Sequence, residues 1–87
     1  MNDTLFSDVR RIAADVLAQP VDRITADGTR DSIPGWDSLA HVNLVLALEQ
    51  HFDVQFLPEE MMEMLTIELV ALLVEEKLAA RSTGGRA

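Results

Sequence analysis

Ser38 is the residue of this sequence whose type and position best suit covalent chemistry. It follows Pro34 and Gly35, which interrupt regular structure, and the next dozen residues contain no helix breaker. A serine therefore lies where a loop turns into a helix, and either Asp37 or Ser38 can cap that helix. The first backbone N–H groups of a helix have no intrahelical partner and carry partial positive charge. An anionic group built on the Ser38 oxygen would therefore be stabilised.

Asp37, Ser38 and His41 are the residue types of a hydrolytic triad, but their spacing argues against nucleophilic catalysis. On one helical turn the three side chains occupy adjacent positions, so Asp37 cannot easily orient His41 while His41 contacts Ser38. The surrounding Trp-Asp-Ser-Leu-Ala also differs from the Gly-x-Ser-x-Gly elbow of hydrolases. A chain of 87 residues has little room for a substrate pocket beside its core. We therefore predict no catalytic residue.

The simplest role for Ser38 is a helix cap, shared with Asp37 and worth about 1 kcal/mol. Three features of the sequence indicate a further role: the long loop before it, the wide apolar arc of the helix after it, and the acidic surface.

The elements before Ser38 are predicted to be one helix and one long loop. Apolar residues recur at helical spacing over residues 4–18 and predict an amphipathic helix that ends before Pro20. These residues are Phe6, Val9, Ala13, Val16 and Leu17. Turn formers are dense from Val21 to Trp36, and loops of this length are often functional. We expect Val21, Ile24 and Ile33 to hold the loop to the core.

The second helix is predicted over Ser38–Phe52, and its apolar residues cover a wide arc. At about 100° per residue they span roughly 220°, whereas one core-facing stripe needs only about 100°. They are Leu39, Val42, Leu44, Val45, Leu46, Leu48 and Phe52. The excess predicts either neighbours on two sides or an apolar face left open, and Glu49 within the arc favours the open face. His41 falls on the core side, where we expect a packed or half-exposed ring.

Two further helices complete the prediction. Pro58-Glu59-Glu60 is typical of a helix start, and the third helix should be short. Thr66 is predicted to cap the last helix, in which apolar residues repeat at helical spacing. The predicted fold is all-α, a four-helix bundle in one domain over residues 1–80, followed by a flexible tail over residues 81–87.

Composition excludes several classes of function. The net charge is −8, and residues 1–80 contain all fifteen acidic but only five basic residues, which gives −10. Such a surface repels nucleic acid and anionic lipid and attracts basic partners. The chain has no cysteine, and two histidines make a poor metal site. No stretch approaches the roughly 20 apolar residues of a membrane span. We expect a cytoplasmic monomer without a metal.

The stretch around Ser38 resembles the acyl carrier protein family. The resemblance begins at Gly35-Trp36-Asp37-Ser38-Leu39 and continues through an apolar helix that ends in Ala47-Leu48-Glu49-Gln50-His51-Phe52. It extends over most of the chain, through Ile24-Thr25-Ala26-Asp27, Pro58-Glu59-Glu60 and Leu65-Thr66-Ile67. The Asp-Ser-Leu triplet alone is a weak motif. At this point of an acidic, cysteine-free chain of this length it is specific, and it implies the acyl-carrier-protein-like four-helix fold.

The resemblance implies a role for Ser38. In the family, the serine of this motif carries a 4′-phosphopantetheine, which a separate phosphopantetheinyl transferase takes from coenzyme A with magnesium. The chain would then be a carrier and a substrate of that transferase, and not an enzyme. The thiol of the arm would hold acyl groups as thioesters and present them to acyl-loading and acyl-processing enzymes.

The resemblance also implies that residues near Ser38 meet the partner enzymes. We expect this recognition surface to comprise Trp36, Asp37, Leu39, Val42 and Leu46. The sequence leaves open the role of three methionines, Met61, Met62 and Met64, which either fill the core or line a space that admits a bound acyl chain.

Three positions depart from carriers of fatty-acid synthesis. Ala40 and Asn43 stand where acids are frequent in those carriers, and Gln50 lies beside the single acid of this helix, Glu49. Docking should therefore depend less on charge, which favours a dedicated biosynthetic pathway. Two alternatives remain open: a peptidyl or aminoacyl carrier of a nonribosomal pathway, and a helical adaptor without cofactor.

Overall fold

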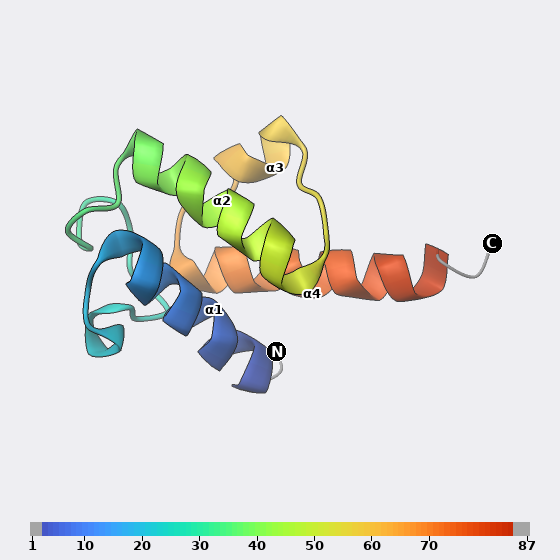
Figure 1. The fold of residues 1–87 in the computed structure, drawn as a ribbon, viewed down its shortest axis with the longest axis horizontal. Helices are drawn as coiled ribbons and strands as arrows, with labels where there is room; N and C mark the ends of the chain where they lie inside the picture. The colour runs from blue at the N-terminus through green and yellow to red at the C-terminus, as the bar shows by residue number, and fades with distance from the viewer. Residues whose placement is uncertain (1–2, 85–87) are drawn as a thin grey trace.

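The computed structural model describes residues 3–84, which form an all-α fold with no strand in that range. The helices are α1 (Asp3–Leu17), the short 3₁₀ helix η1 (Val21–Arg23), α2 (Ser38–Phe52), α3 (Pro58–Met62) and α4 (Ile67–Gly84). Figure 1 shows the long loop at the end of the molecule where α2 begins, with α1 in contact with both α2 and α4. The predicted four-helix fold, with a long first loop and a short third helix, is confirmed.

Both α1 and α2 end at a residue in the left-handed conformation. Ala18 and Asp53 each have φ of 56°. The N–H of Gln19 then donates to the carbonyl of Ala14 at 3.0 Å, and the N–H of Val54 donates to that of Glu49 at 3.2 Å. Both bonds close the C-terminal turn in the manner of a Schellman motif, although neither end has the usual glycine.

Arg10 of α1 holds the long loop that follows. Its guanidinium donates to the carbonyl of Ile24 at 2.7 Å and to that of Val21 at 2.9 Å. The side chains of Ile24 and Ile33 are buried, as predicted, but that of Val21 is 42% exposed. The prediction that Val21 also anchors the loop is wrong, because only its backbone carbonyl is held.

The loop also completes the start of α4. The N–H groups of Ile67 and Glu68 donate to the carbonyls of Gly28 and Ala26, at 3.2 and 2.9 Å. Thr66 caps the helix as predicted, its hydroxyl accepting from the N–H of Leu69 at 3.1 Å. The start of a helix leaves N–H groups unpaired, and here the loop supplies acceptors for two of them.

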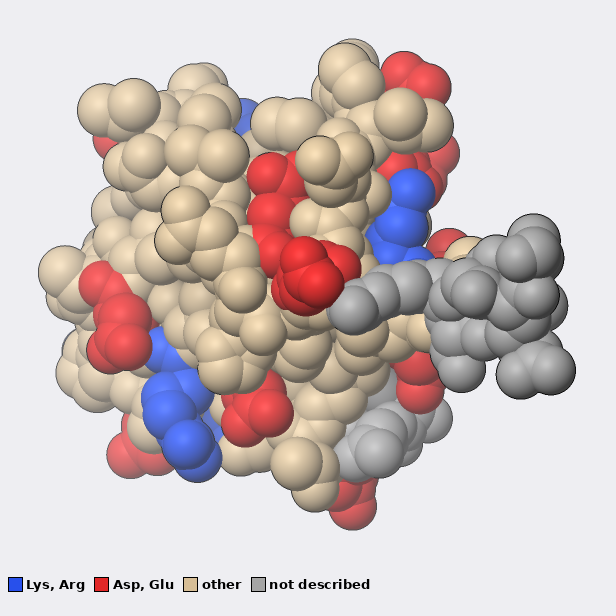
Figure 2. All heavy atoms as spheres, turned by 45° about the vertical axis from the view of Figure 1, so that its right-hand side comes forward, with Lys and Arg blue, Asp and Glu red and all other residues tan. Residues whose placement is uncertain are grey.

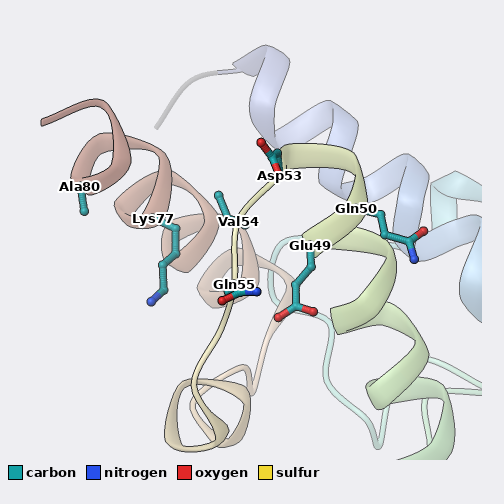
Figure 3. A pocket seen from close by; sticks show the side chains of 7 residues that line it. All are labelled: Glu49, Gln50, Asp53, Val54, Gln55, Lys77 and Ala80. Carbon is teal, nitrogen blue, oxygen red and sulfur yellow. The ribbon is translucent and has the colours of Figure 1, made fainter. Parts of the chain in front are cut away.

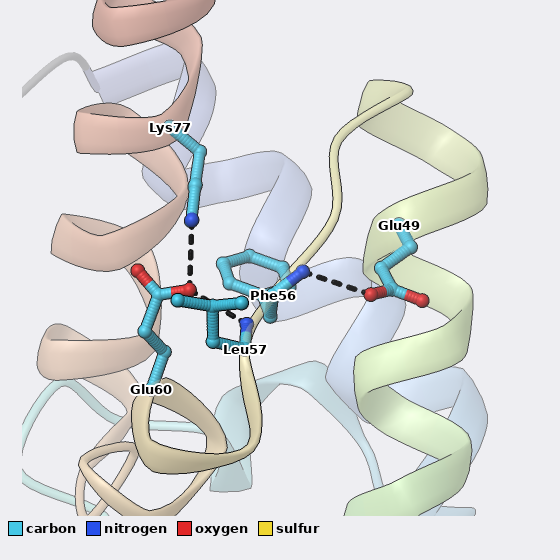
Figure 4. A network of polar contacts seen from close by, with 5 residues as sticks. All are labelled: Glu49, Phe56, Leu57, Glu60 and Lys77. Carbon is cyan, nitrogen blue, oxygen red and sulfur yellow. Dashed lines mark hydrogen bonds and ion pairs between the residues drawn. The ribbon is translucent and has the colours of Figure 1, made fainter.

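Three charged side chains fix the segment between α2 and α4, as Figure 4 shows. Glu49 accepts from the N–H of Phe56 at 2.9 Å, and Glu60 accepts from the N–H of Leu57 at 2.7 Å. Lys77 of α4 pairs with the same Glu60 oxygen at 2.7 Å. The hydrogen bond from Leu57 and the contact with Lys77 lower the pKa of Glu60 below its usual 4.5. Glu49 is partly exposed, and its carboxylate also holds the backbone of the segment that follows α2.

Helix α4 extends further than the predicted domain boundary at residue 80. It continues to Gly84 because Arg81, Ser82 and Thr83 contain no breaker, and glycine is the first residue that weakens it. The flexibility predicted for residues 81–87 stays a prediction, and residues 85–87 lie outside the described part of the chain.

Acidic side chains dominate the charged groups on the face drawn in Figure 2.

Between residues 3 and 84 no helix is long and apolar enough to cross a bilayer. The same range contains no cluster of side chains able to hold a metal ion.

Candidate functional site

Gly35 brings the loop close to the end of α1 just before the site. Its φ is +86°, and a Cβ added there would lie 2.9 Å from the carbonyl oxygen of Leu17. Only glycine adopts this backbone conformation readily and also leaves room for the Leu17 carbonyl. The conformation of Gly35 thus sets where Trp36, Asp37 and Ser38 emerge from the loop.

Asp37, and not Ser38, caps α2. Its carboxylate accepts from the N–H of Ala40 at 2.8 Å, and its carbonyl accepts from the N–H of His41 at 2.9 Å. The sequence left the two residues open as caps, and the extended backbone of Asp37 decides between them. The hydroxyl of Ser38 is therefore left available for another role.

Ser38 presents this hydroxyl to solvent at the positive end of the helix. Its side chain is exposed and has no hydrogen-bond partner among residues 3–84. The backbone N–H groups of Ser38 and Leu39 likewise lack an acceptor within the described chain. An exposed hydroxyl beside two unpaired N–H groups fits the covalent attachment of an anionic group, because the helix terminus attracts negative charge.

The open part of the apolar arc lies on one side of α2. Leu39, Val42 and Leu46 are 71%, 43% and 49% exposed, at i, i+3 and i+7. We call these three residues the outer stripe. The inward part of the arc consists of Leu44, Val45 and Leu48, which are buried in the core. The prediction that the wide arc leaves an apolar face open is confirmed.

Trp36 does not lie on the surface, which corrects its assignment to the recognition surface. Its side chain is 2% exposed, and the indole N–H donates to Nδ1 of His41 at 3.0 Å. Burying the large indole is favourable once its single N–H has an acceptor, and His41 supplies one. Trp36 therefore supports the site from the core and does not contribute to its surface.

His41 joins Trp36 to α3. The ring is 4% exposed, and Nε2 lies 2.8 Å from the carbonyl oxygen of Met61. An indole nitrogen is only a donor, so Nδ1 of His41 must accept, and the proton of the neutral ring must be on Nε2. Nε2 then donates to Met61. The helical spacing of α2 predicted that His41 lies on the core side, but it predicted neither of the hydrogen-bond partners of His41.

The comparisons with known proteins identify the family of this chain. Residues 7–74 match the family model described as "Phosphopantetheine attachment site".

The chain belongs to this family, the acyl carrier proteins.

Two curated acyl carrier proteins are similar over most of their length. "Acyl carrier protein 3" of Ralstonia nicotianae is 32% identical over 80 residues, which cover 92% of each chain. The acyl carrier protein of Akkermansia muciniphila is 32% identical over 75 residues, which cover 86% of this chain and 94% of that one. The solution NMR structure of holo acyl carrier protein from Geobacter metallireducens matches with a TM-score of 0.80 at 28% identity, over 90% of both chains.

As an acyl carrier protein, the chain is a carrier and not an enzyme, and its prosthetic group is a covalent 4′-phosphopantetheine. The exposed, unpartnered hydroxyl of Ser38 fits such a group. The alternative of an adaptor without cofactor is set aside.

An open groove on the surface of this acyl carrier protein is remote from Ser38. It has a volume of about 710 Å³ and lies between the end of α2, the segment after it and α4, and its lining includes Glu49, Gln55 and Lys77 (Figure 3). Ser38 starts α2 and the groove lies at the other end, roughly 20 Å along a helix of 15 residues. The groove is therefore not part of the candidate site.

Proposed function

We propose that Ser38 carries the 4′-phosphopantetheine of this acyl carrier protein, and that the protein serves a dedicated biosynthetic pathway. The main observation behind this proposal is that Asp37 and Ser38 have different roles at the start of α2. Asp37 provides the cap, which leaves the Ser38 hydroxyl exposed and without a partner in the described chain.

The local electrostatics favour a phosphodiester on Ser38. Its negative charge would lie against the N–H groups of Ser38 and Leu39, which have no acceptor within residues 3–84. The attached group supplies a terminal thiol, to which an acyl group is linked as a thioester. The protein positions the attachment point and keeps it accessible to other enzymes.

The surface beside Ser38 supports recognition through apolar contacts. The outer stripe of Leu39, Val42 and Leu46 offers apolar area on the helix that Ser38 begins. Asn43 on the same helix is exposed and uncharged. The partners in this proposal are a phosphopantetheinyl transferase and acyl-loading and acyl-processing enzymes. The cytoplasmic location and the monomeric state predicted from the sequence are part of the same proposal.

A peptidyl or aminoacyl carrier is the second candidate, because the same attachment point can serve either cargo. The identity of the loading enzyme separates the two: an acyl-activating enzyme supports the first, and an amino-acid-activating enzyme supports the second.

The attachment site is tested by mass spectrometry. The protein is incubated with coenzyme A, magnesium and a transferase of broad specificity, and a gain of one phosphopantetheine is expected. Ser38→Ala should abolish the gain, whereas Ser32→Ala should retain it. Ser32 is a matched control because it is an exposed serine of the preceding loop whose hydroxyl is bonded to Thr29. If the Ser38→Ala protein still gained one phosphopantetheine, the assignment of Ser38 as the attachment site would be refuted.

The proposed pathway is tested with enzymes of fatty-acid synthesis. Bacterial ketosynthases of that pathway should elongate chains poorly on this protein. The reason is that Ala40 and Asn43 are uncharged, whereas carriers of fatty-acid synthesis often have acidic docking residues at these positions. Elongation as fast as on their usual carrier would contradict a dedicated role.

A further inference from the structure

The interior next to Ser38 is closed by a chain of hydrogen bonds between α2 and α3. Trp36 donates to His41 at 3.0 Å, and His41 donates in turn to the carbonyl of Met61, 2.8 Å away. The two rings are buried, and their centroids are 5.9 Å apart. The three groups thus connect the residue two positions before Ser38 to the short helix α3, which Figure 1 shows beside α2.

Trp36 belongs to the same hydrophobic core cluster as Ile33 and Met64. Ile33 is 2% exposed and Met64 is 1% exposed. Met62, in contrast, is 77% exposed and points away from the core. Of the three methionines, Met64 therefore fills the core, and Met62 cannot line an interior space.

We propose that the Trp36–His41–Met61 chain keeps the carried acyl group outside the helical core, so that this carrier suits short or polar acyl groups. The inference rests on the proposed attachment at Ser38 and adds the class of cargo to it. A chain entering between α2 and α3 beside Ser38 must displace the His41 ring, which lies on the first turn after Ser38.

Displacing His41 would leave the buried indole N–H of Trp36 without a partner, and the carbonyl of Met61 would keep only backbone bonds of its own turn, such as that from the N–H of Met64 at 3.3 Å. Losing these interior hydrogen bonds is costly, and a chain that enters a filled core must also displace packed side chains, so the burial of its methylene groups does not offset the loss. A short or polar acyl group offers few or no such methylenes. It therefore stays in solvent, where partner enzymes reach it without opening the carrier.

The test compares two loaded forms of the wild-type protein. A broad-specificity transferase transfers either acetyl- or octanoyl-phosphopantetheine from the corresponding coenzyme A thioester, and mass spectrometry verifies complete loading. Two signals are then recorded: the rate at which hydroxylamine cleaves the thioester, and the fluorescence of Trp36, the single tryptophan of the chain. We expect cleavage rates within about twofold of each other, as for a buried state populated to less than half. The emission maximum should be the same for both forms.

Variants of His41 test the cause. His41→Ala should open the interior, so that the octanoyl form is cleaved more slowly than the acetyl form and the Trp36 emission shifts between them. His41→Gln retains one acceptor and one donor and should behave as wild type. Asn43→Ala, at an exposed position of the same helix, is the matched control and should also behave as wild type.

Chain-length dependence in the wild-type protein would overturn the proposal, and this result does not require that His41→Ala folds. A folded His41→Ala protein without chain-length dependence would also overturn it, because His41 would then not be the barrier. A failure of the attachment proposal is distinguishable, since it would appear earlier as the absence of loading on Ser38.

Discussion

Trp36 Nε1 lies 3.0 Å from His41 Nδ1 inside the core, and the two residues stand on either side of the cap of α2. Each is the partner of the other, so removing one leaves a buried polar atom unpaired. This relationship makes the stabilities of the two positions interdependent.

The first prediction concerns this pair. Trp36→Phe and His41→Leu should each lower the free energy of unfolding by about 1–3 kcal/mol, because each orphans a buried group. The double variant should lose less than the sum, since both polar groups of the pair are then absent. Thermal or urea unfolding followed by circular dichroism measures all four proteins. Strictly additive losses would show that the hydrogen bond does not couple the two residues.

Gly35 carries the second prediction. Gly35→Ala should lower the free energy of unfolding by about 1–3 kcal/mol, because alanine must adopt positive φ and approach the carbonyl of Leu17. The neighbouring Pro34→Ala, at an exposed position, is expected to change stability by only about 0.5 kcal/mol or less. If the two variants unfold at the same denaturant concentration, the close approach at Gly35 does not constrain the loop.

The third prediction is a pH dependence at Glu60. Its pKa is lowered in the folded protein by the N–H of Leu57 and by Lys77, so it stabilises the fold above its ordinary pKa of 4.5. This contribution is lost as the pH falls below 4.5 and through the lowered value. Glu60→Gln should therefore be less stable than wild type near neutral pH, by about 0.2–1 kcal/mol for a partly exposed ion pair. The difference should shrink in acid.

Unfolding by urea at several pH values between neutral and strongly acidic measures this difference. Glu59→Gln, in the same first turn of α3, is the matched control, because Lys77 pairs with Glu60. A gap between Glu60→Gln and wild type that widens in acid would have the wrong sign for a lowered pKa.

The fourth prediction tests the outer stripe. Leu39 is 71% exposed, so Leu39→Ser should change the free energy of unfolding by no more than about 0.5 kcal/mol. The kcat/KM of the transferase for the protein should nevertheless fall about tenfold, which corresponds to a lost contact worth about 1.4 kcal/mol. Leu65→Ser, 63% exposed and outside α2, should leave kcat/KM unchanged. Equal losses in the two variants would indicate a general effect of surface hydrophobicity.

Local patterns in the sequence were sufficient for the helices and for the position of Ser38. Apolar spacing predicted α1 and α2 to within about a residue. Pro58-Glu59-Glu60 predicted the start of α3, and Thr66 predicted the cap of α4. These features depend on neighbours in the chain, and so the chain alone determines them.

Contacts between distant residues could not be predicted in the same way. Lys77 pairs with Glu60 and Arg10 holds the carbonyl of Ile24 only because separate elements meet in space. The reach of Glu60 back to the N–H of Leu57 could have been found, since an acid three residues after a helix cap is a known signal.

The sequence by itself determined the acidic four-helix chain, the wide apolar arc of α2 and the serine at the start of that helix. The tertiary structure decided which of two candidates caps α2, and it thereby left Ser38 exposed. It also moved Trp36 from the expected surface into the core. Because Trp36 lies in a loop, no helical spacing indicates whether its side chain points to the core or to the surface. Its burial depended on an acceptor for the indole N–H, and only the folded chain brings His41 and the carbonyl of Met61 into that position.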